Sequence, residues 1–537
     1  MKSLLFAFFV LCLSCFPHGT RLDAQALPVG DDTVSRSEVS NVSLYPEDNE
    51  LAAPLAGAEN TNVVVAPLIQ TRWHQRAPYN DLFPMVDGSR AITDCSNIAL
   101  AQILRFHQYP SRGTSKIEAA KVRGIAVGNV DFGVVYDWKN MLAVYRSDNG
   151  DSTVRQREAV AGLLFQLDAA RGTSKSNGNI PVALTEYFGY DKSIERHWRI
   201  YYNDADWQAM IRSQLDAGLP VYYWGNDPNT SHTFVVDGYD STGKFHINLG
   251  WGGRHDGWYF LDNLNPPSHG RSWYDKQTVI INIKPDEGGN GSGELFITGF
   301  RASKIDIAQN EVFTVTVDLR SPGFFPGGQA GVALVAADDS IVMVLGIANY
   351  SERNPGTSGT REIDCFVPES VSPGQYRLMT AVRLAGQGWK LLTRSAVGNG
   401  ISNAIDCTIS SGVSNGGGYG LAIRSITPDT TSAAYNERFA VVARTRNISP
   451  DNFPGGQMGV ALVDNQGSMV TVIGSVSFGA LNPGSTWTRT ISNCSVPETV
   501  ARGQYQLMIV VRPEGREWRI ATMSVENTPT SIDFTVR

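Results

Sequence analysis

The chain has 537 residues, 42% of them hydrophobic, and a formal net charge of −7 at pH 7. This length leaves room for about three domains of ~150 residues each. The acidic balance gives no broad basic surface, which excludes nucleic acid as a main partner. We also expect no transmembrane segment, because no stretch of the sequence is apolar for long enough to cross a bilayer.

The N-terminal residues have the pattern of an export signal. A short positive start precedes an apolar run from Leu4 to Phe16, which is too short for a membrane-spanning helix and typical of a secretory signal peptide. We place the signal peptide at 1–24 and a short, polar leader or propeptide at 25–62. A lipoprotein signal ending at Cys15 is the alternative. We therefore expect a secreted or cell-surface-associated protein.

Two Gly- and Ser-rich stretches divide the rest of the chain, and both are typical of linkers. The expected segments are a first domain at 63–285, a linker at 286–293, a β-sandwich at 294–410, a second linker at 411–418 and a second β-sandwich at 419–537.

An internal repeat supports this division. FPGGQAGVALV from Phe325 reappears as FPGGQMGVALV from Phe453, 128 residues later, and a second matched block starts at Cys365 and again at Cys494. Two copies of one module are indicated. Short alternating stretches between Gly, Pro and Asn turns predict that both copies are all-β, immunoglobulin-like sandwiches.

Three cysteines fall in the repeats. Cys407 in AIDCTIS corresponds to Phe534 in SIDFTVR, and a position that takes either residue is typical of a hydrophobic core. We therefore predict that Cys365, Cys407 and Cys494 are buried thiols, with a disulfide between Cys365 and Cys407 as the alternative.

The remaining cysteine, Cys95, precedes an apolar run, CSNIALAQILRFH, that predicts a buried helix ending before Pro110. Thr93 or Asp94 is the expected N-cap. This places Cys95 in the first turn, where free N–H groups and the helix dipole favour a thiolate. A nucleophilic cysteine also needs a base.

The best candidate base is His232, one of eight histidines in the chain. SHTFVVDGY and KFHINLGWGG predict two strands of a hairpin joined by DSTG. A turn centred near Ser241 puts His232 opposite about Gly250 and makes Asn248 a neighbour on the same face of the sheet. A slip of one residue would break that arrangement.

Cys95, His232 and Asn248 occur in the order of the papain-like proteases, with the histidine 137 residues after the cysteine. Beyond this order, several blocks resemble the streptopain family of secreted bacterial cysteine peptidases (family C10, papain fold). They are VVAPLIQTRWHQRAPYNDLFP, RAITDCSNIALAQILRFHQYP, YDWKNM, YFGYDKSI, LDAGLPVYYWG, SHTFVVDGYD and FHINLGWGGRHDGWYFLDNLNP.

The resemblance implies a role for each matched site residue. Cys95 would be the nucleophile and His232 the general base and acid. Gln75 would donate a hydrogen bond in the oxyanion hole, and Asn248 and Trp251 would support the histidine. The resemblance implies a multidomain protein with an α+β papain-like protease domain at 63–285, and neither a metal nor a cofactor.

Four residues of the site depart from the family pattern. Asp94 replaces the Gly before the cysteine, and its charge would oppose the thiolate if it pointed inward. Ser231 and Thr233 replace the Gly and Ala that flank the histidine, and Leu249 replaces an aromatic residue. The leader is also shorter than the family's inhibitory propeptide.

The function expected from the sequence is that of a secreted cysteine endopeptidase acting on proteins and peptides, with host or cell-surface ligands as candidate partners of the sandwiches. The first alternative is a catalytically inactive adhesin in which the sandwiches carry the function. The second is a transglutaminase-like acyl transferase, which the Asn at 248 disfavours because that class uses an acid there.

Overall fold

The computed structural model describes residues 62–537 except for 146–151, 174–178, 229, 265, 267–272, 274, 397–399, 412–419, 449–451, 483 and 523–528. The predicted signal peptide, the predicted leader up to residue 61 and nearly all of the predicted second linker fall outside these residues.

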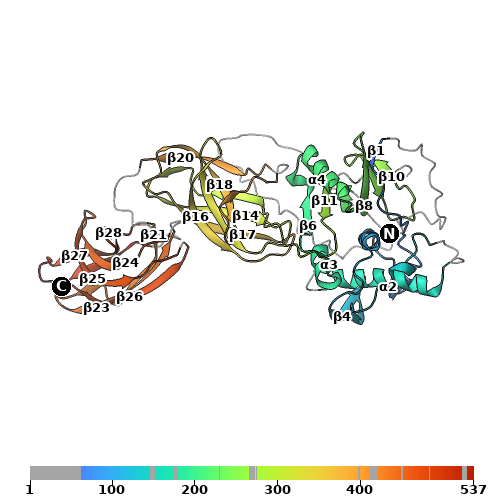
Figure 1. The fold of residues 1–537 in the computed structure, drawn as a ribbon. Coiled ribbons are helices and arrows are strands. Elements are labelled where there is room, and N and C mark those ends of the chain that lie inside the picture. The colour runs from blue at the N-terminus through green and yellow to red at the C-terminus, as the bar shows by residue number, and fades with distance from the viewer. Residues whose placement is uncertain are drawn as a thin grey trace, which may run out of the picture. The chain divides into compact units, whose positions relative to one another are not determined.

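Residues 63–285 combine four helices with a seven-stranded antiparallel sheet (Figure 1). The strand order is β10-β9-β8-β7-β11-β6, and β1 pairs with β8. The helices are α1 (Cys95–His107), α2 (Val154–Arg171), α3 (Ile180–Phe188) and α4 (Asp204–Asp216). The strands of this sheet are β1 (Val63–Val65), β6 (Glu195–Trp198), β7 (Val221–Asn226), β8 (Ser231–Asp240), β9 (Phe245–Asn248), β10 (Gly257–Tyr259) and β11 (Asp275–Ile281). Two small hairpins complete the part, β2 (Met85–Val86) with β3 (Ser89–Arg90) and β4 (Lys116–Val122) with β5 (Ile125–Asp131).

Helix α1 confirms the prediction made from its sequence. The side chain of Asp94 caps it by accepting the Asn97 N–H at 2.8 Å, and every residue from Asn97 to Leu104 is buried. The helix ends at His107, three residues before Pro110, and at its C-cap Gln108 the backbone turns left-handed with φ of 48°. The cap settles the choice between Thr93 and Asp94.

The sheet separates two hydrophobic cores. The first is formed mainly by α1, α2 and α3 and includes Val235 of β8. The second is formed mainly by α4, β9 and β11 and includes Phe234 and Val236 of the same strand. Successive side chains of a strand point to opposite faces, so β8 contributes side chains to both cores. One face of β8 therefore packs against the helices of the first core.

The two C-terminal parts are built of strands in the same order. Each has a three-stranded sheet and a six-stranded sheet. In the first part these are β12-β14-β17 and β13-β20-β18-β15-β16, with β19 paired to β18; in the second they are β21-β23-β26 and β22-β29-β27-β24-β25, with β28 paired to β27. The first part consists of β12 (Phe296–Ala302), β13 (Asp306–Ala308), β14 (Val312–Arg320), β15 (Gly328–Val335), β16 (Ile341–Tyr350), β17 (Ser358–Phe366), β18 (Gly374–Arg383), β19 (Lys390–Leu391) and β20 (Ala404–Ser410). The second consists of β21 (Leu421–Pro428), β22 (Ser432–Ala433), β23 (Arg438–Asn447), β24 (Gly456–Val463), β25 (Met469–Phe478), β26 (Thr486–Ser495), β27 (Gly503–Pro513), β28 (Arg519–Ile520) and β29 (Ser531–Val536).

In each β-rich part the two sheets share one core. Cys365, Cys407 and Cys494 lie in these cores as free thiols, each at most 3% exposed. The prediction of buried thiols is confirmed, and the disulfide alternative is wrong. Phe534, the counterpart of Cys407, is fully buried as well. Among the described residues, no helix is long and apolar enough to cross a membrane.

Because Cys365 and Cys407 are separate core thiols, we expect reductant to leave the unfolding midpoint of the protein in guanidinium chloride unchanged. Peptide mapping after denaturation without reductant should recover both cysteines alkylated. A bridged peptide carrying both residues would contradict the structure.

Candidate active site

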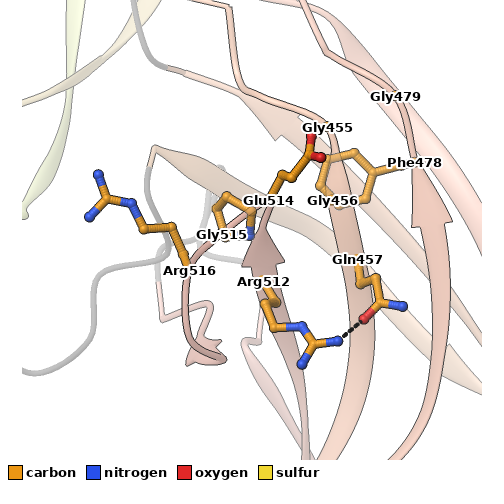
Figure 2. Close-up of a pocket in the computed structure, with 10 residues that line it drawn as sticks. Gly455, Gly456, Gln457, Phe478, Gly479, Arg512, Glu514, Gly515 and Arg516 are labelled. Carbon is orange, nitrogen blue, oxygen red and sulfur yellow. Dashed lines mark hydrogen bonds between the residues drawn. The ribbon is translucent and has the colours of Figure 1, made fainter.

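An open hollow of about 680 Å³ lies on the second β-rich part, between the ends of β24, β25 and β27 (Figure 2). Figure 2 shows the Arg512 side chain donating a hydrogen bond to Gln457. The residues that line the hollow are Gly455, Gly456, Gln457, Phe478, Gly479, Arg512, Pro513, Glu514, Gly515 and Arg516. The lining holds neither a thiol nor an imidazole, so the predicted cysteine and histidine lie elsewhere.

The Cys95 thiol lies at the junction of α1 and β8. Cys95 is the first residue of α1 and is partly buried. Thr233, the residue that follows His232 on β8, hydrogen-bonds the sulfur through its backbone and its side chain. The neighbouring Ser96 hydroxyl lies 3.1 Å from the Thr233 hydroxyl. The fold therefore brings the cysteine to within one position of the histidine along β8.

The electrostatic surroundings of Cys95 act in both directions. Burial raises the pKa of the Cys95 thiol, and the negative charge of Asp94 raises it further. Hydrogen bonding by Thr233 and the positive charge of Arg171 lower this pKa. The net result is a pKa above the usual value, so a thiolate at neutral pH requires a further cation such as an imidazolium.

The His232 imidazole is held between two indole rings. Its ring centre lies 4.7 Å from that of Trp251 and 4.9 Å from that of Trp273. His232 is 3% exposed, and its Nε2 lies 2.9 Å from the carbonyl oxygen of Leu249.

The hairpin exists as predicted, but its register differs by one residue. Val235 pairs with Asn248, and a β-bulge follows between Val236 and Gly238. The turn is centred one residue later than expected, and the bulge adds an extra residue to β8. Asn248 therefore faces the core that contains Val235, opposite to His232, and the expected same-face neighbourhood is wrong.

Asn248 instead connects three segments behind the histidine. Its Oδ1 accepts hydrogen bonds from Gln102 of α1 at 3.0 Å and from the Gly250 N–H at 3.1 Å. Its Nδ2 donates to the Thr71 carbonyl at 2.9 Å. Asn248 thus fixes the turn that carries the Leu249 carbonyl.

Gly250 allows this turn to pack directly on α1. Its φ is +71°, and a Cβ at this position would lie only 2.8 Å from Ile98. A side chain here would both strain the backbone and clash with the helix.

Gln75 contacts the segment that leads into helix α1. The side-chain Nε2 of Gln75 donates to the Thr93 carbonyl at 2.8 Å, and the backbone carbonyl of Gln75 accepts the Thr93 N–H at 3.2 Å. The side chain is 4% exposed. Since an amide nitrogen carries two hydrogens, the Gln75 side chain keeps one N–H beyond its bond to Thr93, two residues before Cys95.

A half-buried acid binds the backbone of the residue that contacts His232. The Asp256 carboxylate accepts the Leu249 N–H at 2.8 Å, while the Leu249 carbonyl, in the next peptide unit, contacts His232. Burial raises the pKa of Asp256 to about 7.

A second acid–histidine pair lies nearby, with His246 Nδ1 2.7 Å from Asp237 Oδ1. Burial lowers the pKa of His246, but the hydrogen bond and charge of Asp237 outweigh this and raise it.

Sequence reasoning missed three contributors to the site. They are the Leu249 backbone carbonyl, Trp273 and Asp256. A main-chain acceptor has no sequence signature, and Trp273 lies in a stretch without a recognisable motif. Asp256 lies between a glycine-rich turn and a strand. Its position in that turn is the one feature of the sequence that could have indicated a role at the site.

The raised pKa of Asp256 predicts a pH-dependent stability. The folded chain keeps a proton on Asp256 that the unfolded chain, with a pKa of about 4, has lost. Stability should therefore fall as pH rises from about 4 to 7. Asp256→Asn has no carboxyl group to ionise, so it lacks this pH-dependent loss of stability. The melting temperature of the variant minus that of wild type should therefore rise between pH 5 and pH 8. The exposed Asp262→Asn is the control. A difference that is constant with pH would contradict the assignment.

Comparison with known proteins adds a family to this geometry. The Peptidase C10 family model matches residues 73–259, which contain all five predicted site residues. Streptopain of Streptococcus pyogenes is 29% identical over 286 residues, covering 48% of this chain and 72% of streptopain. The thiol protease/hemagglutinin PrtT of Porphyromonas gingivalis is 31% identical over 246 residues, covering 41% of this chain and 28% of PrtT.

Among solved structures, the active interpain A cysteine protease of Prevotella intermedia is 31% identical, with a TM-score of 0.37, and the match covers 42% of this chain and 97% of that protein. The chain belongs to the Peptidase C10 family and is a streptopain-like, cysteine-type peptidase.

Proposed function

We propose that the protein is a secreted endopeptidase that hydrolyses peptide bonds in proteins with Cys95 as the nucleophile and His232 as the general base and acid. The observation that carries the proposal is the junction of α1 and β8. A half-buried thiol at a helix N-terminus lies against Thr233, and the residue before Thr233 on the strand is a buried histidine.

The bond to Leu249 suits His232 for this role. A carbonyl oxygen can only accept a hydrogen bond, so Nε2 must carry a proton. In the neutral ring Nδ1 is then the basic nitrogen. The Leu249 carbonyl would also stabilise the imidazolium once Nδ1 has taken the proton.

Hydrolysis then proceeds in two stages. The proton of the Cys95 thiol passes to Nδ1 of His232, and the thiolate attacks the carbonyl carbon of the substrate. The C–N bond breaks, and the leaving amine takes the proton from the imidazolium. Water, deprotonated by His232, cleaves the thioester and restores the thiol. Catalytic hydrogen bonds are often long without substrate, so we expect the sulfur and imidazole to close together when a peptide binds.

Gln75 is the proposed side-chain donor of the oxyanion hole, together with the N–H of Cys95 itself. Its contact with Thr93 places the amide beside the start of α1. Cys95 is the first residue of α1, so its own N–H has no acceptor within the helix and can serve as the second donor. Asn248 supports the site indirectly, since it fixes the turn that carries the Leu249 carbonyl.

The remaining assignments are part of the same proposal. We infer a papain-like arrangement for 63–285, immunoglobulin-like sandwiches for 294–410 and 419–537, and export by the N-terminal signal.

Trp251 and Trp273 shield the imidazole from water. Of the four departures from the family pattern, Asp94 and Thr233 contact the cysteine helix or its sulfur directly.

The first test removes the proposed pair. Cys95→Ala and His232→Ala should each abolish casein hydrolysis while the circular dichroism spectrum is unchanged, because the thiolate and its base act as one unit. An epoxide inhibitor should label the wild type at Cys95 alone. A Cys95→Ala protein that still cleaves casein would refute the proposal. A folded wild type that neither cleaves nor reacts would favour the inactive adhesin.

The second test concerns the oxyanion donor. Gln75→Ala should lower kcat by roughly a hundredfold or more and leave KM nearly unchanged, because the bond to the oxyanion exists only in the transition state. Gln75→Glu, which keeps the shape, should also lose activity. Unchanged turnover in both variants would assign the donor elsewhere.

A further inference from the structure

A cluster of charged side chains surrounds the cap of the cysteine helix. Arg171, the last residue of α2, donates from Nη1 to both carboxylate oxygens of Asp94, at 2.9 and 3.1 Å. Arg123, from the turn between β4 and β5, lies 3.2 Å from the same carboxylate. Asp94 therefore interacts with two cations from two other elements of the fold.

The same cluster is tied to α1 by Asn97. Its Oδ1 accepts from Arg171 at 2.6 Å, its backbone N–H donates to Asp94, and its Nδ2 donates to Asp168 at 2.9 Å. Asp168 in turn accepts the backbone N–H of Arg123 at 2.7 Å. These hydrogen bonds link Asp94, Asn97, Asp168, Arg123 and Arg171 into one network that joins the start of α1 to α2 and to the β4–β5 turn.

This network solves a problem created by Asp94. A carboxylate next to Cys95 in the chain opposes the formation of a second negative charge on the sulfur. A cation bound to that carboxylate cancels most of its field at the sulfur, and also keeps the carboxylate on the Asn97 N–H as the helix cap.

We propose that Arg171 is a positioning residue for the reaction: it holds and neutralises Asp94 so that Cys95 can ionise at neutral pH. The inference rests on the proposed function in that Cys95 is the nucleophile. Arg171 would not touch the substrate. It would act through Asp94, and its loss would expose the sulfur to an uncompensated negative charge.

The charged and titratable groups around the sulfur come from every element that packs on it. Those that act on the sulfur are Asp94 of the α1 cap, Arg171 of α2 and Tyr222 of β7; Asp168 of α2 and Arg123 of the β4–β5 turn act on Asp94, and His232 precedes Thr233 on β8. Burial works to raise the pKa of Asp94, but the charges of Arg171 and Arg123 outweigh it and lower that pKa. Asp94 is therefore ionised at neutral pH, and its counter-charge matters there.

The experiment measures the rate of Cys95 alkylation by iodoacetamide against pH in the full chain, with the labelled peptide quantified by mass spectrometry. Arg171→Met removes the cation and keeps the length of the side chain. It should move the midpoint of the profile up by about one pH unit, a roughly tenfold slower reaction at neutral pH. Asp94→Asn, which still caps the helix, should move the midpoint down.

Three further variants complete the test. Arg171→Lys should stay near wild type, because it keeps the charge. The double variant Asp94→Asn with Arg171→Met should return most of the way to wild type, since both charges are gone. Arg155→Met is the matched control on α2, because it breaks an exposed ion pair with Asp137 and should leave the profile unchanged.

An unchanged midpoint in a folded Arg171→Met, or shifts in the same direction for Arg171→Met and Asp94→Asn, would overturn the inference. If Arg171→Met does not fold, Asp94→Asn must still lower the midpoint and Arg171→Lys must retain it. Alkylation does not require hydrolysis. Casein cleavage by Cys95→Ala would therefore refute the proposed function alone and leave this result interpretable.

Discussion

The packing of the N-terminus of α1 on β8 is the constraint on which the site depends. It brings the Cys95 sulfur to the backbone of Thr233, although the two residues are 138 positions apart in the sequence. Both elements are buried, and α1 is apolar around nearly its whole circumference. The helix packs in the first core and β8 contributes to both cores, and close packing of this kind leaves the thiol and the imidazole little freedom to move.

Polar groups behind the histidine convert that packing into orientation. Both backbone polar groups of Leu249 are bound, the carbonyl by His232 and the N–H by Asp256. Asn248 fixes the same turn from α1 through Gln102. An orienting main-chain carbonyl cannot change its protonation state, so it can hold the imidazole in one tautomer over a wide pH range.

The two sides of the site handle buried charge differently. On the cysteine side, Asp94 is paired with Arg171 and Arg123 and its charge is balanced. On the histidine side, the half-buried Asp256 has weaker compensation, and desolvation raises its pKa to about 7. Burial of a carboxylate is costly unless a partner or a proton neutralises it. The chain uses a partner next to the proposed nucleophile and a proton next to the proposed base.

The sequence by itself determined the helix of Cys95, its cap, the hairpin of His232, the repeated β-rich parts and their buried cysteines, because these follow from local periodicity, capping chemistry and internal repetition. It also identified the family through matched blocks. Only the tertiary structure decided the face of Asn248, since a displaced turn and one bulge reverse the side to which a strand residue points. It alone also revealed the Leu249 carbonyl, Trp273 and Arg171 as neighbours of the site, because main-chain acceptors and long-range ion pairs leave no pattern in a single sequence.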